Sequence, residues 1–286
     1  MTSETPAVRQ RRLDLGKRLG EIRRDARLTA RELASRAGWH ESKCSNIQSG
    51  RRLPSSDDIR AWTAVCGVPE QADDLIAAAH GIEGMYVEWR RAARNGARHI
   101  QYTAVPLFKG TRHFRIYEPG VIPGLLQTRA YAGAILSTSV RRLDSGADVE
   151  AEIEAAVEGR LQRQEVLYDG GGRRFAFLIE ESALRSRVAD DETMAAQYGH
   201  LLRVAELPHV SLGVIPSGVR RAVWPVEGFW IFDQARVVVE TVTAEITITQ
   251  PSEVRQYART FAQLGQLAVH GAALRSLVTT AIDSLG

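Results

Sequence analysis

The chain has 286 residues, of which 44% are hydrophobic and 25% are charged, a composition that suits a globular protein of about two domains. Its apolar runs are too short to span a bilayer, and its first residues lack the basic-then-apolar pattern of a secretory signal, so we expect no membrane span and no export. Two cysteines, Cys44 and Cys66, exclude a disulfide-stapled scaffold and favour a cytoplasmic location.

The net charge is only +3, but the positive charge is concentrated near the N-terminus. Residues 1–60 carry 14 Lys and Arg against 8 Asp and Glu, whereas residues 81–286 carry 23 of each. This imbalance favours a polyanionic partner, although a solvated charged face explains the same counts equally well. Residues 1–12 lack apolar periodicity and end in an arginine-rich stretch, which predicts a mobile basic arm.

Residues 13–80 are predicted to form five short helices, and therefore a small all-helical domain. Thr29 can cap the second helix, with Glu32 three residues later as its partner in a capping box. A third helix is expected over residues 41–49, and it stops at Gly50.

The most specific pattern lies around the second and third of these helices. Ala34 is a small residue that lets two helices cross closely, and Gly38, four positions later, supplies a turn. Cys44 and Ile47 then place the apolar side of the following helix on the first, and Cys44 is expected in the core. This is the steric pattern of a helix-turn-helix, whose second helix enters the major groove of DNA.

The stretch from Leu28 to Ser55 resembles the lambda-repressor-like, XRE-type regulators, and the resemblance implies a five-helix DNA-binding domain. Ala30 departs from the family pattern, because a glutamine often binds a phosphate there. We expect Arg31 or the basic arm to take over that contact. Trp39 replaces a small aliphatic residue and is expected to pack against the domain core.

Helix geometry assigns roles to the polar residues of the predicted recognition helix. Asn46 suits a bidentate pair with adenine, Glu41 can accept from cytosine N4, and Ser42 serves either partner. Basic residues would bind phosphates and set the register. The predicted DNA-binding residues are Arg31, Glu41, Ser42, Lys43, Ser45, Asn46, Arg51 and Arg52, of which Lys43, Arg51 and Arg52 are assigned to phosphates. The alternative is that these are merely exposed polar residues on a surface helix.

A single domain of this size binds DNA weakly, so we expect a homodimer that reads two half-sites on double-stranded DNA. Residues 81–115 are predicted to form a basic connector, and residues 116–286 an α+β domain that supplies the dimer contact. Short strand-to-strand connections near residue 235 favour a largely antiparallel sheet in that domain.

A Pro-Gly-rich segment over residues 117–128 predicts a stiff loop. Leu125 and Leu126 would anchor it, and Thr128 can cap the helix that follows. A rigid loop packed on the sheet explains this pattern without any functional role. Four aromatic residues further along are expected in the core and on the sheet face, with a small-molecule pocket as the lesser alternative; they are Trp224, Phe229, Trp230 and Phe232.

The same segment resembles the actinobacterial antitoxin-like XRE regulators, and further matches extend the resemblance from about residue 14 to the C-terminus. Members lie beside a gene for a small partner protein, so the resemblance implies DNA binding combined with the sensing of a partner or ligand. It assigns no chemistry to individual residues of the second domain.

We take Glu118, Gln127 and Glu240 as the candidate partner or effector residues. Glu240 is expected on a buried strand, paired with an arginine such as Arg185 or Arg115, and a structural role suits it better than a functional one.

No catalytic constellation is evident in the sequence, and we expect no enzymatic activity, no metal and no cofactor. His40 and Cys44 have a ligand spacing but lack a second pair. The glycine run 170–172 precedes a strand rather than a helix, and so lacks the helix N-terminus that a phosphate loop needs.

The sequence therefore predicts a sequence-specific DNA-binding transcriptional regulator that acts as a dimer and senses a partner or ligand through its C-terminal domain. The alternative is an antitoxin-like interaction module that restrains a small partner protein and binds DNA mainly for autoregulation. A repressor gated by a small molecule is a third hypothesis.

Overall fold

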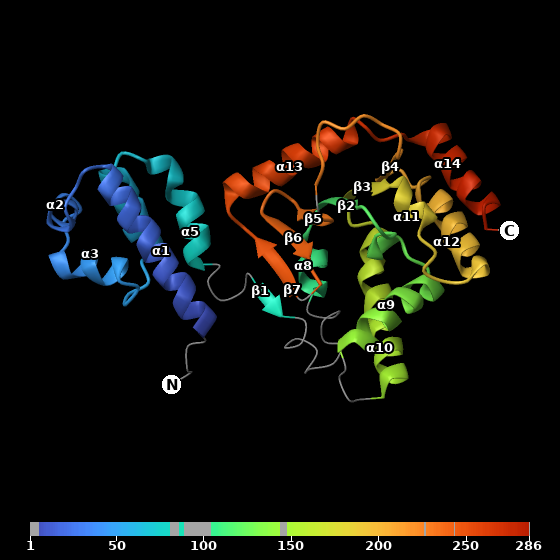
Figure 1. Ribbon diagram of the computed structural model, residues 1–286, viewed down its shortest axis with the longest axis horizontal. Coiled ribbons are helices and arrows are strands. Elements are labelled where there is room, and N and C mark those ends of the chain that lie inside the picture. The colour runs from blue at the N-terminus through green and yellow to red at the C-terminus, as the bar shows by residue number, and fades with distance from the viewer. Residues whose placement is uncertain are drawn as a thin grey trace. The chain divides into compact units, whose positions relative to one another are not determined.

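The computed structural model (Figure 1) describes residues 6–80, 86–88, 104–143, 148–225, 227–242 and 244–285. The chain divides into two compact units, one of residues 1–86 with 248–254, and the other of residues 87–247 with 255–286. Within the described ranges no helix has both the length and the apolar character needed to cross a bilayer.

The first unit is helical. It contains α1 (Pro6–Asp25), α2 (Ala30–Arg36), α3 (Glu41–Gln48), α4 (Ser56–Val65), the 3-10 turn η1 (Pro69–Gln71) and α5 (Ala72–His80). Because α1 begins at Pro6, the prediction of a mobile arm is wrong for residues 6–12, and residues 1–5 lie outside the described part. Proline suits the first helical position and arginine is a good helix former, which explains why this basic stretch continues the helix.

The core of the helical unit forms around Trp62, which is fully buried. Its indole nitrogen donates to the backbone oxygen of Leu19 in α1 at 3.1 Å, so the ring joins α4 to α1. The ring of Trp39 lies 6.1 Å from that of Trp62, which confirms that Trp39 packs against the core.

The second unit combines helices with a mixed sheet. Before β3 it contains β1 (Tyr86–Glu88), α8 (Val105–Gly110), β2 (His113–Glu118), η3 (Gly124–Leu126), α9 (Arg129–Leu143), α10 (Val149–Gln164) and η4 (Glu165–Leu167). It continues with β3 (Arg174–Glu180), α11 (Glu181–Arg185), α12 (Asp191–Val204), β4 (Val210–Ile215), β5 (Phe229–Phe232), β6 (Arg236–Glu240), β7 (Ala244–Ile248), α13 (Pro251–Gly265) and α14 (Gly271–Asp283). Of the predicted connector 81–115, the parts 81–85 and 89–103 lie outside the described residues, and its end already holds α8 and the start of β2.

The strand order is β1-β7-β6-β5-β2-β3-β4, and the sheet is partly parallel. β2 pairs in parallel with β3, and β3 with β4, whereas β5 runs antiparallel to both β2 and β6. The expectation of a largely antiparallel sheet is therefore wrong. The short connection near residue 235 does form an antiparallel hairpin, but the helical segments α9–α10 and α11–α12 act as crossovers, which parallel neighbours require.

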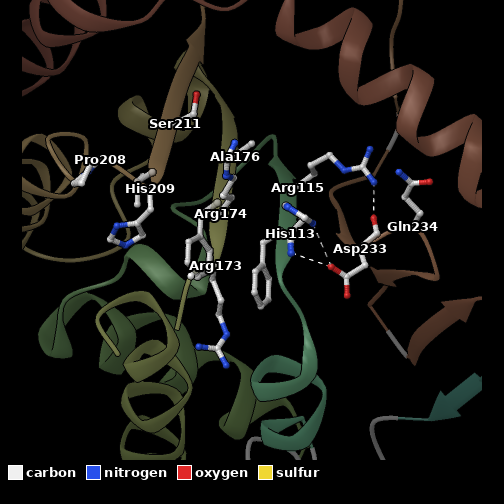
Figure 2. A pocket seen from close by; sticks show the side chains of 14 residues that line it. His113, Arg115, Arg173, Arg174, Ala176, Pro208, His209, Ser211, Asp233 and Gln234 are labelled. Carbon is white, nitrogen blue, oxygen red and sulfur yellow. Dashed lines mark hydrogen bonds and ion pairs between the residues drawn. The ribbon is translucent and has the colours of Figure 1, made fainter. Parts of the chain in front are cut away.

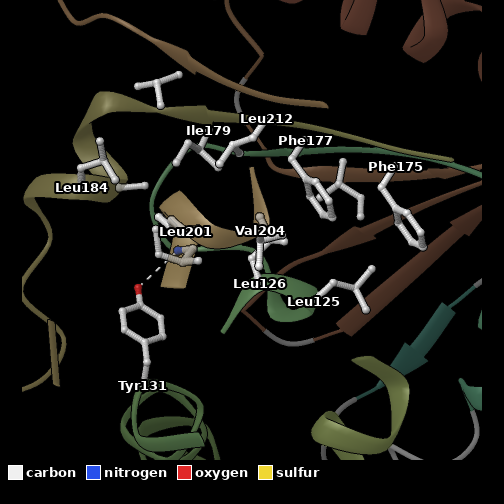
Figure 3. Close-up of a cluster of buried hydrophobic side chains, with 14 of the residues drawn as sticks. Leu125, Leu126, Tyr131, Phe175, Phe177, Ile179, Leu184, Leu201, Val204 and Leu212 are labelled. Atoms are coloured by element: carbon white, nitrogen blue, oxygen red, sulfur yellow. Dashed lines mark hydrogen bonds between the residues drawn. The ribbon is translucent and has the colours of Figure 1, made fainter. Parts of the chain in front are cut away.

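One face of the sheet is buried beneath helices. Phe114, Phe175 and Phe177 stack along it, with ring centroids 4.7 and 6.1 Å apart. Figure 3 shows Leu125 and Leu126, from the predicted Pro-Gly-rich loop, in the same cluster. This confirms that the two leucines anchor the loop.

The loop leads directly into α9. Thr128 Oγ1 accepts from the backbone N–H of Tyr131 at 3.3 Å, so the predicted cap is present. The hydroxyl oxygen of Tyr131 in turn accepts from the backbone N–H of Ile122 at 3.2 Å, which ties the start of the loop to the helix (Figure 3).

A buried ion pair fixes the end of β3. The Glu180 carboxylate is 7% exposed and accepts from the hydroxyl of Tyr117 at 2.8 Å and from the Arg221 guanidinium at 2.7 Å. Arg221 belongs to the loop between β4 and β5, so the pair fastens that loop to the sheet. Burial, together with the bond to Glu180, raises the pKa of Tyr117 and keeps its proton on the hydroxyl group.

We predict that Glu180→Ala lowers the free energy of unfolding of the C-terminal unit by about 3 kcal/mol, because the substitution removes the partner of the partly buried Arg221 guanidinium. Urea unfolding followed by circular dichroism measures this change. The control is Glu206→Ala, which removes an exposed pair with Arg275 and should cost no more than about 1 kcal/mol. Equal losses in the two variants would contradict the assignment.

Candidate nucleic-acid interface

The turn between α2 and α3 has the conformation that the sequence predicts. Thr29 and Glu32 form the capping box: the Glu32 N–H donates to Thr29 Oγ1 at 3.1 Å, and the Thr29 N–H donates to Glu32 Oε2 at 2.7 Å. The backbone bond from Thr29 lowers the pKa of Glu32. Gly38 follows α2 with φ of +69°, a conformation that glycine adopts at no steric cost. α3 therefore begins three residues after this turn.

α3 is capped by a residue that sequence reasoning missed. His40 Nδ1 accepts from the Ser42 backbone N–H at 3.3 Å and lies 2.8 Å from the Ser42 hydroxyl oxygen. With Nδ1 as the acceptor, the Ser42 hydroxyl donates to the ring and keeps only its lone pairs for another partner. Histidine is not a common capping residue, so its position before the helix was the only available signal.

The end of α3 is held by two glycines. A Cβ atom at Gly16 of α1 would lie 2.6 Å from the backbone oxygens of Ile47 and Gln48, so only glycine allows this close contact. Gly50 has φ of +65° and ends the helix as predicted. Cys44 and Ile47 are buried, which confirms that they form the inward side of α3.

The outward side of α3 is polar. Among the predicted base-reading residues, Glu41, Ser42 and Ser45 are exposed and Asn46 is half-buried. The backbone N–H groups of Arg51 and Arg52 donate to the Asn46 backbone oxygen at 2.9 and 3.1 Å, which orders the chain after the helix.

The side chains of Arg51 and Arg52 are exposed, as is that of Arg31 in the first turn of α2. Exposed guanidinium groups therefore occur in the helix before α3 and in the segment directly after it. Their positions are compatible with phosphate contacts that flank a helix in the groove.

Lys43 differs from the other predicted phosphate-binding residues. Its ammonium group is hydrogen-bonded to Asp58 at the start of α4 and lies 4.3 Å from the centroid of the Trp39 ring. Burial raises the pKa of Asp58, but hydrogen bonds from Lys43 and Ser55 outweigh burial and hold that pKa below its usual range. Lys43 therefore has an internal role that links α3 to α4.

All three candidate effector residues of the second unit act on Arg160 of α10. Gln127 is buried, donates to the Ile122 backbone oxygen at 2.7 Å and accepts from the Arg160 guanidinium at 2.8 Å. Burial lowers the pKa of Arg160, whereas the negative charges of Glu240 and Glu118 raise it. Both carboxylates therefore act on the same guanidinium that Gln127 contacts.

Glu118 ends β2, and its carboxylate accepts from the Trp230 indole N–H at 2.7 Å. Burial raises the pKa of Glu118 to about 7, an effect that this hydrogen bond opposes. The space around the carboxylate is tight, since a Cβ atom at Gly228 would lie 2.7 Å from Glu118 Oε2.

The expectation for Glu240 is partly wrong. It is the last residue of β6 and is exposed, because the strand ends there. Arg185 pairs instead with Glu181, and Arg115 donates to the backbone oxygen of Asp233. A buried carboxylate of this sheet is instead that of Glu180, whose partner Arg221 lies 41 positions away and could not be inferred from the sequence.

The protonation of Glu118 makes the stability of the C-terminal unit depend on pH. A carboxyl group whose pKa rises from 4.5 to about 7 on folding makes the folded state bind protons more readily, so stability falls as the pH rises through that window. We predict that the free energy of unfolding falls by at most about 3 kcal/mol between pH 5 and pH 8. For Glu118→Gln, the free energy of unfolding should vary less with pH and should be higher at pH 8 than in the wild type. Urea unfolding across this range tests the sign. Glu253→Gln, at an exposed position, should leave the profile of the wild type unchanged.

Comparison with known proteins supports a DNA-binding regulator. A family model described as a helix-turn-helix domain matches residues 14–75, and one described as a domain of unknown function (DUF5753) matches residues 109–280. The chain is also similar to a Bacillus subtilis (strain 168) protein described as the uncharacterized HTH-type transcriptional regulator RghRB, with 30% identity over 104 residues, which are 36% of this chain and 73% of that protein. No solved structure matches the chain. The chain therefore belongs to the DUF5753 family and carries an N-terminal helix-turn-helix domain.

Proposed function

We propose that this chain is a sequence-specific transcriptional regulator that places α3 in the major groove of double-stranded DNA. The observation that carries the proposal is the pair α2 and α3 joined at Gly38, with Cys44 and Ile47 buried on one side of α3 and a polar row exposed on the other. An amphipathic helix held in this way presents its first two turns to a groove.

Asn46 is the main candidate for direct base reading. An asparagine amide can pair bidentately with adenine N6 and N7, and within the described residues the Asn46 amide makes no hydrogen bond that would have to be broken first. Glu41 and Ser45 are exposed beside it, and Ser42 contributes acceptor lone pairs.

Arg51, Arg52 and Arg31 are the proposed phosphate contacts. Ala30 lacks the hydrogen-bonding side chain that the related regulators often have, and Arg31 follows it directly in α2. Lys43 contributes less in this proposal, because contact with a phosphate would cost its bond to Asp58.

We propose further that the regulator acts as a homodimer and that its C-terminal unit provides the dimer contact and senses a partner or ligand, without catalysis. A single small domain binds DNA weakly, whereas a dimer can bind two half-sites at once. Dimerisation would therefore raise the affinity for DNA. The resemblance to antitoxin-like XRE regulators supports the sensing role.

A binding titration tests the proposal. Fluorescent duplex DNA from the upstream region of the gene is titrated with wild type and variants at several salt concentrations, and light scattering gives the oligomeric state. Asn46→Ala should lose about 1–3 kcal/mol of discrimination against random duplex. Arg51→Ala should weaken binding to both duplexes and reduce the log-salt slope by about 1.

Arg60→Ala serves as the control, since Arg60 is exposed on α4 and pairs only loosely with Asp73, at 3.7 Å. This variant should bind as the wild type does. If the wild type binds the upstream duplex no more tightly than random duplex at every salt concentration, autoregulation through this DNA is contradicted. If Arg60→Ala loses discrimination, the assignment of base reading to Asn46 is contradicted.

A second candidate function is an interaction module that restrains a small partner protein, and Trp224 favours it. This residue was expected in the core but is 79% exposed, in the loop that Arg221 and Glu180 fasten to the sheet. The Arg221 guanidinium lies 5.4 Å from the centroid of its ring. Tryptophan is one of the residue types enriched among those that dominate the energy of protein interfaces.

For this candidate, the product of a neighbouring gene is co-expressed with the chain. A complex of fixed stoichiometry that survives high salt without DNA would support the module, and Trp224→Ala should then weaken it by at least about tenfold. Tyr168→Ala, at another exposed aromatic residue, is the matched control. Absence of a complex, or equal loss in both variants, would remove this candidate.

A further inference from the structure

The sheet of the C-terminal unit has a second face that helix α13 covers along only part of its length. The rings of Tyr257 and Phe261 on α13 lie 5.0 and 6.5 Å from that of Phe229, near the ends of the strands where β2 finishes. At the opposite ends, where β2, β3 and β4 begin, the surface is hollowed into a cavity of about 960 Å³ (Figure 2).

The strand register explains the floor of this cavity. Arg115 on β2 stands opposite Ala176 on β3, which stands opposite Ser211 on β4. His113 and Arg174 stand opposite each other two residues earlier, and therefore on the same face. The small side chains of Ala176 and Ser211 leave room above the sheet, and the cationic side chains border that room (Figure 2).

Arg115 is a half-buried cation that makes no hydrogen bond to a carboxylate within the described residues. Its guanidinium donates to the backbone oxygen of Asp233 in the β5–β6 turn, and burial lowers its pKa. The carboxylate of Asp233 accepts instead from the backbone N–H groups of Arg112 and His113, at 3.1 and 2.9 Å. Asp233 therefore offsets part of the positive charge, and no other described residue accepts from the remaining guanidinium donors of Arg115.

Arg174 adds a second guanidinium to the same face. Its side chain is exposed, and no ion pair of Arg174 occurs within the described part of the chain. Because Arg174 and Arg115 lie on adjacent strands, diagonally across one pleat, their charges repel each other unless an anion lies between them. The imidazole of His113, 3.7 Å from the Asp233 carboxylate, completes this side of the cavity.

The other charged groups at the rim are already engaged. Arg173 pairs with Asp169 and points away from Arg115 in Figure 2. The ring nitrogen of His209 lies 2.7 Å from the backbone oxygen of Leu167. Among the described rim residues, Arg115 and Arg174 are therefore the cations that an anion can reach.

We propose that this cavity is a binding site for a small organic oxyanion, with the phosphate or carboxylate group between Arg115 and Arg174 and the body of the ligand over Ala176 and Ser211. A guanidinium recognises both kinds of oxyanion through paired N–H donors. The volume lies at the upper end of the range of about 300–1,000 Å³ that is typical of small-molecule sites. Small oxyanions would then be the ligands that the C-terminal unit senses. The binding site itself does not depend on the proposed function, but its role in regulation does.

Isothermal titration in phosphate-free buffer tests the site with the full-length protein. The probes are inorganic phosphate, adenosine 5′-monophosphate and succinate, with adenosine as the uncharged control. At least one of the three anions should bind saturably with a Kd below about 1 mM, and adenosine should not. Binding of inorganic phosphate as tight as that of the nucleotide assigns recognition to the oxyanion alone, and binding of succinate alone assigns it to a carboxylate ligand.

Arg174→Gln should weaken the binding by at least about tenfold, and Arg115→Gln combined with Arg174→Gln should abolish it. Arg174 is exposed, so the single variant should keep the wild-type fold, which circular dichroism checks. Arg255→Gln, at an exposed arginine of α13, should bind as the wild type does. The proposal is overturned if no anion binds saturably, or if the double variant, folded as the wild type, binds equally well.

The same variants separate this site from the proposed function. Arg174→Gln should retain wild-type affinity for the upstream duplex in the absence of ligand, because the cavity lies on the second unit and not on α3. If the wild type binds an oxyanion but no specific DNA, the anion site is supported and the regulator proposal is contradicted. If it binds specific DNA but no oxyanion, the regulator proposal is supported and the anion site is contradicted.

Discussion

The packing of α3 against α1 and α2 is the constraint on which the candidate interface depends. α3 has only eight residues, too few for stable helix formation in isolation, so tertiary contacts must hold it. Cys44 and Ile47 supply the buried side, and the absent side chain at Gly16 allows α1 to touch the backbone at the end of α3. Because these contacts occupy the inward side of the helix, Glu41, Ser45 and Asn46 are left for a partner, whereas Lys43 is engaged with Asp58.

The same logic of burial explains why the second unit offers a cavity at one end of its sheet. A parallel sheet needs helical cover, and the crossovers α9–α10 and α11–α12 supply it on one face. On the other face the cover comes from α13, whose rings pack against Phe229. The uncovered beginnings of the strands would expose apolar surface if they carried large side chains. They carry arginine, histidine, alanine and serine instead, which solvent tolerates and an anion can use.

Features encoded by neighbouring residues could be predicted from the sequence, and features formed across the chain could not. The capping box at Thr29, the turn at Gly38 and the cap at Thr128 each depend on residues within four positions, and all are present. The sheet topology was predicted wrongly, because the β5–β6 hairpin gives a local signal whereas the parallel pairs join strands more than 30 residues apart. For the same reason the pairing of Glu180 with Arg221, which is distant in sequence, was not predicted, while exposed Glu240 was expected to be buried.

The structure also divides the predicted interface into groups with different freedom to bind. Ser42 is bonded to His40, and Lys43 to Asp58 and Trp39, so both side chains are fixed before any partner arrives. A fixed side chain loses little conformational entropy on binding, but it must surrender an existing bond to form a new one. Arg51 and Arg52 have the opposite properties, since their backbone is ordered by Asn46 while their side chains remain exposed. Affinity would therefore come from exposed guanidinium groups on an ordered backbone, and discrimination from the polar groups of α3 that give up no existing hydrogen bond when they bind.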